Sequence, residues 1–543
     1  MAPTQIELVP GTEILLSTED GTPDKLILIP EPSDRSDDPL NWSTTWKTIV
    51  IANQAIFVFI SILTPLAIAP LTPIFIQEFH KSIPEVNMLF GAAAMALGYA
   101  NFIIVPFSNV FGRRPTILIC GLICVLANIW QARVTSYNSF LAARVISGLG
   151  AAANESIMPM VIGDVMFLHQ RGLWMGVYFW AYFIGVSLGP IISGNIAAHI
   201  SWRWFFWVCT ILQGVSLLMM VFMFPETLYR RSSSIPNAVD SSSSHGSSTP
   251  ETKSEEPTIT AAKLSSASSK ELSARSNEHI PTATSHHITG RPTPAQFSLI
   301  PRLHLTPLEI KQTLLLDVLA PLQIVFYPII LWVIFAFGMT TTCLLALNLT
   351  QSQVFAAPPY NFSPAAVGFV NFALVVGGIV GLCTAGPVSD WLSLRLARRN
   401  GGVREPEMRL WVLVPYVAIC LVGMTITAVG YQRHWPWQAI VVIGYGFVGI
   451  ISVSLPTILI SYAVDCYKHI PGQIMVSSTV VKNTFGFGLI FFFNDWAVSD
   501  GFIPPVLTIM ALSVGSTVVG MVVFLRWGKS FRRRTAGSRL HDL

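Results

Sequence analysis

A carboxylate within a long apolar stretch is the first group in this sequence that could do chemistry. Glu155 follows Arg144 by eleven residues and precedes Asp164 by nine. A helix advances about 100° per residue, so Arg144 and Glu155 share one face, while Asp164 lies on the opposite face. An unpaired carboxylate at the centre of a bilayer costs about 3 kcal/mol or more, and such groups commonly line ion or proton pathways.

We therefore interpret Glu155 as a cation-binding or proton-carrying group with Arg144 on its face. A structural ion pair is the alternative interpretation. Asp164 is assigned instead to a charge network at the cytoplasmic end of the helix.

Two further polar sites interrupt apolar runs. Lys482 and Asn483 could face a cavity, but pairing with an acid or snorkelling to the membrane edge is favoured for the lysine. Tyr178 and Tyr182, four residues apart, could form an aromatic wall for a cation, with a lipid-facing or core position as the alternative. The seven cysteines form no CxxC pair and lie apart from histidines, so neither a metal nor another cofactor is expected.

The elements that position these groups follow from composition. The chain has 543 residues, 52% of them hydrophobic and only 11% charged, which indicates a membrane protein. The sequence has no basic stripe interleaved with aromatics, so a nucleic-acid partner is not expected. It has no Walker A sequence, so ATP hydrolysis is not expected. No arrangement of a nucleophile or of paired carboxylates stands out, so an enzyme is not expected.

Apolar runs of spanning length recur along the chain, so we expect an all-α fold of twelve transmembrane helices in two six-helix bundles. The first run begins too far from the start for a signal peptide. The expected spans are 48–69, 86–108, 116–134, 139–163, 172–196, 204–224, 322–347, 364–388, 410–430, 436–462, 472–493 and 502–525.

The spans divide the chain into five parts. A Ser-, Thr- and Pro-rich stretch poor in aromatics separates the two sets of six and is expected to be a disordered linker. The parts are an N-terminal tail (1–47), a first bundle (48–231), the linker (232–306), a second bundle (307–526) and a basic tail (527–543).

Lys and Arg gather in the loops on the side of the two termini, which predicts cytoplasmic termini by the positive-inside rule. The sequon at Asn361 then falls in an outer loop as a glycosylation candidate. The chain is expected to interact with the lipid bilayer, as a monomer in the plasma membrane.

Small residues and turns form further motifs. Gly185, Gly189, Pro190 and Gly194 make a stripe that lets another helix approach closely, and Gly377 and Gly381 offer a matching stripe. The loop that ends in Gly112, Arg113 and Arg114 recurs at the corresponding place in the second half, around Asp390. The recurrence indicates an internal repeat of the kind transporters carry.

These motifs resemble those of the major facilitator superfamily and, within it, the fungal twelve-span drug:proton antiporters. Gly112-Arg113-Arg114 matches the end of the superfamily's loop signature, Gly-x-x-x-Asp-Arg-x-Gly-Arg-Arg. Val105, Asn109 and Val110 stand where that signature has Gly, Asp and Arg. The difference predicts a weakened charge latch in the first half, with Asp390 carrying more of that role.

Other stretches extend the resemblance over nearly the whole chain apart from the N-terminal tail and the linker. The run from Arg144 to Gly150 is similar to a fourth-span motif linked in that family to proton transfer, with Ser147 in place of Gln. The stretch 185–194 is similar to its fifth-span antiporter motif. The segments around Glu155 and from Arg398 to Arg409 resemble a subgroup that includes a polyamine and organic-cation carrier.

The resemblance implies an alternating-access carrier whose first, fourth, seventh and tenth helices line a central cavity. For the hydroxyl groups on these helices, bonding to their own backbone is the alternative. The implied lining residues are Asn53, Gln54, Glu155, Thr340, Thr341, Thr342, Asn348, Tyr445, Ser452 and Ser454.

The predicted function is proton-coupled transport of a small cationic or amphipathic organic solute, a drug or a metabolite, with export by proton antiport. Its partners are therefore a small-molecule substrate and protons. Proton-driven uptake of polyamines or organic cations is the first alternative. A non-transporting nutrient sensor, which could dispense with an intramembrane carboxylate, is the second.

Overall fold

The computed structural model describes residues 11–14, 16–17, 25–26, 30, 32–67, 69–229, 290–298, 306–467 and 470–535. The linker predicted to be disordered lies outside these residues apart from its last part, and so do Lys468 and residues 536–543 of the predicted tail. Twelve helices of the described chain are long and apolar enough to cross a membrane. The expected fold class is thereby confirmed.

Helices of the first half lie between residues 44 and 223, and two of their spans are built from two helices each, α3 with α4 and α6 with α7. The first-half helices are α1 (Thr44–Leu66), α2 (Thr72–Phe79), α3 (Ile83–Tyr99), α4 (Asn101–Phe111), α5 (Arg113–Ala132), α6 (Tyr137–Ala151), α7 (Ala153–Val165), α8 (Arg171–His199) and α9 (Trp202–Met223).

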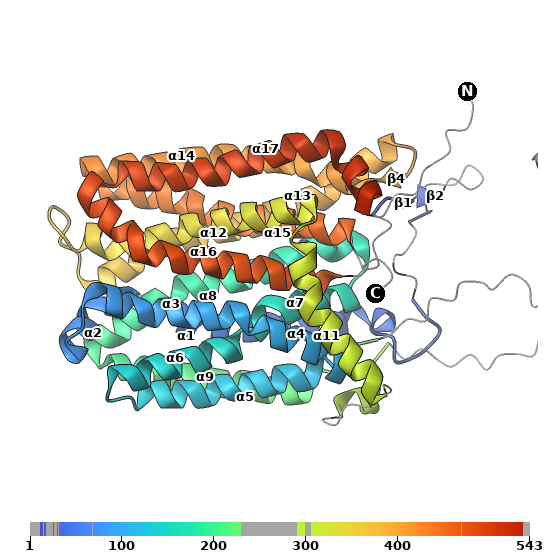
Figure 1. Ribbon diagram of the computed structural model, residues 1–543, viewed down its shortest axis with the longest axis horizontal. Coiled ribbons are helices and arrows are strands. Elements are labelled where there is room, and N and C mark those ends of the chain that lie inside the picture. Colours follow the sequence, from blue (N-terminus) through green and yellow to red (C-terminus); the bar gives the residue numbers. More distant parts are fainter. Residues whose placement is uncertain are drawn as a thin grey trace, which may run out of the picture. The chain divides into compact units, whose positions relative to one another are not determined.

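Helices of the second half run side by side with those of the first (Figure 1). They are α11 (Pro307–Ile324), α12 (Pro328–Phe355), α13 (Pro364–Arg399), α14 (Leu413–Arg433), α15 (Gly446–Cys466), α16 (Pro471–Asp500) and α17 (Ile503–Thr535). A π-helical segment, η6 (Ala439–Tyr445), precedes α15, and a 3-10 segment, η5 (Pro406–Val412), precedes α14.

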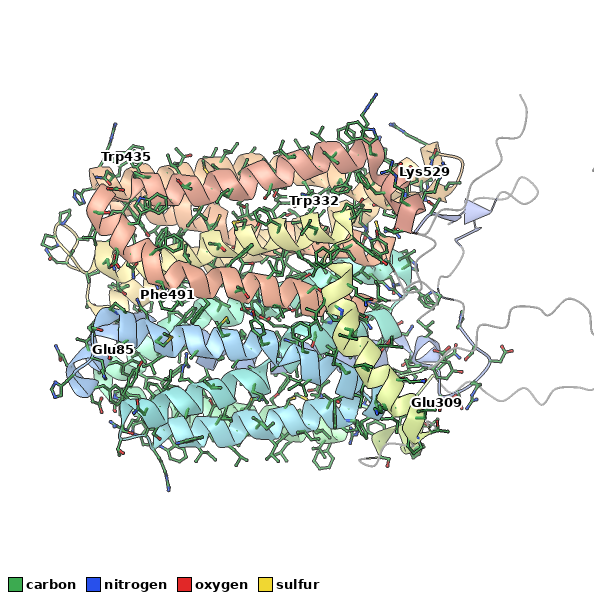
Figure 2. The ribbon with its side chains drawn as sticks, viewed as in Figure 1. Glu85, Glu309, Trp332, Trp435, Phe491 and Lys529 are labelled. Atoms are coloured by element: carbon green, nitrogen blue, oxygen red, sulfur yellow. The ribbon has the colours of Figure 1, made fainter. Side chains whose placement is uncertain are left out.

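We call the end of the helices at which α1 begins and α17 ends the terminal end, and the opposite end the distal end. Glu309 and Lys529 lie toward the terminal end, and Glu85 and Trp435 toward the distal end (Figure 2). Near the terminal end, β1 (Glu13–Ile14) pairs with β4 (Val403–Arg404), which ties the N-terminal segment to the second half. A second short antiparallel pair joins β2 (Leu16–Ser17) to β3 (Lys25–Leu26).

Helix α11 was not expected from the sequence. The seventh span, predicted from residue 322, begins instead at Pro328, because α11 ends at Ile324 and a turn separates the two helices. The apolar residues Leu315 and Leu322 of α11 are 58% and 52% exposed, and α11 is not among the helices apolar enough to span a membrane. Figure 1 shows α11 crossing the other helices obliquely at the terminal end.

Both predicted glycine stripes lie where helices approach closely. A Cβ on Gly185 would collide with Ile62 and with the carbonyl of Phe59, both on α1. In the second half, a Cβ on Gly377 would collide with the carbonyl of Gly446 on α15. In these two pairs, the missing side chain lets one helix backbone rest against the next.

The close approach at Gly377 can be tested directly. Gly377→Ala is expected to destabilise the protein by about 1–3 kcal/mol, because a methyl group there overpacks a backbone contact that cannot retract. The temperature of unfolding in detergent micelles measures the loss. Gly488→Ala is the matched control, because nothing lies within 4 Å of a Cβ at Gly488 on α16. An equal effect of the two substitutions would contradict the packing argument.

Candidate functional site

The centre of the molecule holds a buried ion pair that joins the two halves. The Lys482 ammonium on α16 contacts Oε1 of Glu155 on α7. Glu155 is 1% exposed and Lys482 is 5% exposed, so both charges are withdrawn from water. Asn483 Nδ2 donates a hydrogen bond of 3.2 Å to the second carboxylate oxygen of Glu155. Each charged group therefore has its partner across the boundary between the halves.

Aromatic rings complete the surroundings of the Lys482 ammonium. The ammonium donates to the Tyr182 hydroxyl at 3.0 Å and lies 4.5 Å from the centroid of that ring. The Phe337 ring centroid lies 5.8 Å away, on α12. A carboxylate with two aromatic rings is a favourable environment for an ammonium group.

The start of α7 aims Glu155 at the other half. The fourth span is interrupted after Ala151, so Glu155 lies in the first turn of α7. Its neighbours bond within the first half, because Asn154 Nδ2 donates to Ser61 Oγ at 2.6 Å and Ser156 Oγ donates to Asn101 Oδ1 at 2.6 Å. These bonds fix the helix on both sides and leave the Glu155 carboxylate to face α16.

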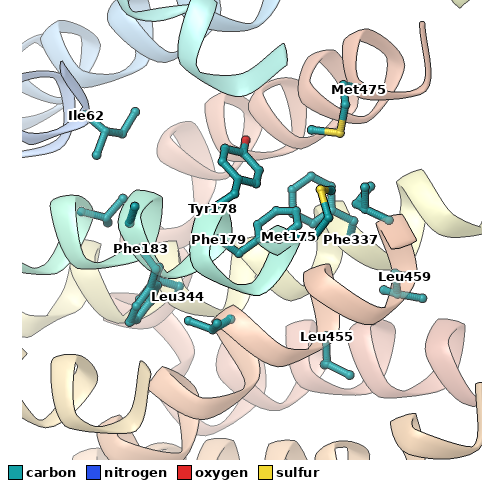
Figure 3. Close-up of a cluster of buried hydrophobic side chains, with 14 of the residues drawn as sticks. Ile62, Met175, Tyr178, Phe179, Phe183, Phe337, Leu344, Leu455, Leu459 and Met475 are labelled. Atoms are coloured by element: carbon teal, nitrogen blue, oxygen red, sulfur yellow. The ribbon is translucent and has the colours of Figure 1, made fainter. Parts of the chain in front are cut away.

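Two small cavities flank the ion pair. The larger, of about 60 Å³, contains Thr341, Asn348 and Asn483 in its wall, and the smaller, of about 20 Å³, contains Phe337 and Ser452. Tyr182 and Lys482 line both. Phe179 and Phe337 both line the smaller cavity and lie 5.9 Å apart between ring centroids. Figure 3 shows these two rings within the cluster of buried apolar side chains.

Four predicted lining residues therefore lie with Lys482 around the cavities: Thr341, Thr342, Asn348 and Ser452. The hydroxyls of Thr341 and Ser452 donate to carbonyls of their own helices, at 3.0 Å to Phe337 and 2.7 Å to Val448. That is the alternative recognised from the sequence, and it leaves both oxygens able to accept another bond.

Arg144 is not part of this site, contrary to the expected shared face with Glu155. Its guanidinium is fully buried and donates to the carbonyls of Leu89 at 3.1 Å and Thr64 at 2.8 Å, and also to that of Pro65. Carbonyls near the end of α1 and on α3 bind the guanidinium and hold it away from Glu155. Arg144 thus binds α6 to α1 and α3.

Three other predicted lining residues pack within their own halves. Asn53 Nδ2 donates to the Met219 carbonyl on α9 at 3.1 Å, and Gln54 also faces that helix. The Tyr445 hydroxyl shares a hydrogen bond with that of Tyr431. The structure does not bring these residues to the cavities, since each points a polar group at a neighbouring helix of its own half.

The loop motif of the first half forms a network at the terminal end. Arg113 lies 3.3 Å from Asp164, in line with the role assigned to that aspartate. Gly112 has a φ of +105°, and a Cβ there would collide with Glu226. The Glu226 carboxylate accepts from the backbone N–H groups of Arg113 and Arg114 at 2.9 and 3.1 Å, and so caps α5. Sequence reasoning missed Glu226, whose only signal is its place just after the sixth span.

The corresponding network in the second half crosses to the first. Asp390 Oδ1 lies 2.7 Å from Arg409, and Oδ2 accepts from the backbone N–H of Leu173 on α8 at 3.1 Å. Asp465, which sequence reasoning missed, lies 2.7 Å from Arg409 and 2.8 Å from Arg404. Burial lowers the pKa of the Arg404 guanidinium, and the Asp465 carboxylate opposes that shift.

The glycosylation candidate lies in the loop between α12 and α13. Asn361 is exposed, with a φ of +50°, and the exposed Ser363 of its sequon caps α13 by accepting from the N–H of Ala366. Glycosylation there stays a prediction.

Comparison with known proteins identifies relatives over almost the whole chain. The family model described as Major Facilitator Superfamily matches residues 54–487. The chain is 26% identical to Protein HOL1 of Saccharomyces cerevisiae, covering 93% of this chain and 90% of that protein. It is 24% identical to the probable efflux pump mfs2 of Aspergillus flavus, covering 87% and 99%. Its fold resembles the proton:xylose symporter XylE, with a TM-score of 0.56 at 13% identity, covering 89% of this chain and 96% of that one.

The central ion pair is open to a double-mutant cycle. Glu155→Gln and Lys482→Gln are each expected to destabilise the protein by about 3 kcal/mol, because each leaves the opposite buried charge without its partner. The double substitution is expected to cost less than the sum of the two. Unfolding in detergent measures all three, and strict additivity would contradict the pairing.

Proposed function

Because the chain belongs to the Major Facilitator Superfamily and moves small solutes across a membrane, we propose that it exchanges protons for a cationic or amphipathic organic solute. Glu155 is the group on which the exchange depends. The observation that carries this proposal is the contact of Glu155 with the ammonium of Lys482 inside the membrane-spanning part of the chain.

The surroundings of Lys482 indicate the chemistry of the solute. A carboxylate, a tyrosine hydroxyl and two aromatic rings surround an ammonium that belongs to the protein itself. A solute with a protonated amine would find the same partners if it displaced Lys482. Asn348 and Thr341 in the adjoining cavity offer hydrogen-bonding groups to the rest of the solute. The aromatic and aliphatic wall suits an amphipathic body.

The need to keep the buried site neutral couples solute binding to proton release. Without solute, the Glu155 carboxylate and the Lys482 ammonium form a neutral pair, and the ammonium carries a proton that can be given up. When a solute ammonium takes the place of the Lys482 ammonium on Glu155, the pair gives up that proton to the water of the pathway. One positive charge leaves as another arrives, so the buried site never holds two cations beside one carboxylate.

Mutually exclusive occupancy by proton and solute is the property of an antiporter, and we propose export as its direction. The similarity to a probable efflux pump supports this direction. The basic residues of the terminal end, among them Arg526 and Lys529, favour a cytoplasmic location for that end. Uptake of polyamines or organic cations by the same site is the second candidate, because the site's chemistry does not depend on direction.

Transport by purified protein in proteoliposomes tests the proposal. A pH gradient, acidic on the side opposite the solute, is expected to drive the accumulation of labelled spermidine or ethidium at least about tenfold faster than no gradient does. Glu155→Gln is expected to abolish this dependence on the gradient, because no carboxylate remains for which proton and solute compete.

Asp500→Asn is the matched control, because Asp500 is an exposed carboxylate on the same helix as Lys482. It is expected to transport as the wild type does. Gradient-driven transport of both cations by Glu155→Gln at the wild-type rate would overturn the proposal, and so would preferential transport of the anion taurocholate by the wild type.

A further inference from the structure

Helix α11 carries one buried carboxylate among exposed apolar residues. Asp317 is 8% exposed, whereas Leu316 and Val318 on either side of it are exposed. The helix leads directly into α12, and it packs on α4 of the first half as well as on α16 of the second. The buried side of α11 thus lies over the boundary between the two halves.

The Asp317 carboxylate binds one side chain from each half. Its Oδ2 accepts from Asn109 Nδ2 at 2.7 Å, near the end of α4. Its Oδ1 accepts from Gln473 Nε2 at 2.8 Å, in the first turn of α16. Ser477 Oγ, one turn further along α16, donates to the Pro321 carbonyl of α11 at 2.8 Å. Asp317 is therefore held by the second half and reaches across to the first.

Asn109 lies between a cation and this anion. Its Oδ1 accepts from Arg113 Nη1 at 2.6 Å, and its Nδ2 donates to Asp317. The amide dipole is oriented favourably toward both charges, so the two hydrogen bonds strengthen one another. Asn109 is also the position at which this chain departs from the aspartate of the related loop signature. The loop itself lacks a carboxylate at this position, but the Asp317 carboxylate of α11 contacts Asn109 there.

We propose that Asp317 is a positioning residue of the transport cycle that latches the terminal end shut. Held by Gln473, it closes the boundary by binding Asn109, and the Asn109–Asp317 bond breaks when the halves separate at that end. About one turn along α4 from Asn109 and along α16 from Gln473, a buried apolar cluster joins the halves. In it, Val105 and Met160 of the first half pack on Val476 of the second. The latch holds this apolar seal closed and biases the equilibrium between carrier states.

Thiol labelling at Val476 measures opening of the seal. The background carries Cys383→Ser, because Cys383 is the exposed one of the seven cysteines and the other six are buried. Val476→Cys is added, and the purified protein is labelled with a membrane-impermeant maleimide. Asp317→Ala is expected to raise the labelling rate about tenfold, the change that accompanies loss of a hydrogen bond to a charged group. The same protein without Val476→Cys gives the background rate.

A rescue separates a latch from a merely structural role. Asn109→Asp combined with Asp317→Asn exchanges the amide and the carboxylate, keeps a bond between them, and lets the residue at 317 still accept from Gln473. The labelling rate of the exchanged pair is expected to lie within about twofold of the rate of the parent protein, which carries only Cys383→Ser and Val476→Cys. Asp317→Asn alone is expected to label faster than that parent. Gln312→Ala, on the exposed side of α11, is the control and is expected to leave the rate unchanged.

Parental labelling rates in both Asp317→Ala and Asp317→Asn would overturn the latch, as would failure of the exchanged pair to slow labelling below Asp317→Asn. If Asp317→Ala does not purify as a monodisperse protein, Asp317→Asn and the exchanged pair decide the matter. The labelling experiment requires no solute and no pH gradient, so its outcome is independent of the proposed proton exchange.

Discussion

A buried ammonium and a buried carboxylate are stable in a protein interior only while they remain paired. Glu155 and Lys482 are such a pair, and they stand on different halves of the chain. Any movement that separates the halves must therefore supply a replacement for each of them. A proton, water or the ammonium of a solute can do so, and this requirement links the occupancy of the site to the position of the halves.

The same requirement explains what the surrounding residues do. Tyr182 and Asn483 satisfy the remaining bonding capacity of the pair, so the closed state holds both charges at low cost. At the terminal end, Asp390 and Asp317 make further contacts between the halves, to the backbone of Leu173 and to Asn109. The glycine-lined helix pairs pack closely within each half, whereas α8 packs on α13 and α3 packs on α16 across the boundary between the halves.

Those features that depend on composition and hydrophobic periodicity could be predicted from the sequence. The twelve spans, a charged group buried inside a span at Glu155 and the pairing of Lys482 with an acid followed from the rarity of charge in apolar runs. The partner of each charge did not follow, because Glu155 and Lys482 are 327 residues apart. The prediction that Arg144 belongs to the site was wrong, because the backbone carbonyls of α1 and α3 that bind its guanidinium cannot be read from a helical period. Helix α11 was missed because its apolar side merges with the span that follows.

Proton release on solute binding tests directly whether proton and solute exclude one another at Glu155. Isothermal titration of the purified protein with spermidine, in two buffers of different ionisation enthalpy at the same pH, gives the number of protons released per bound solute. If proton and solute exchange at Glu155, the wild type is expected to release about one proton per bound spermidine and Glu155→Gln none. Binding of spermidine to the wild type with the same enthalpy in both buffers would show that no proton is exchanged and would contradict this exchange.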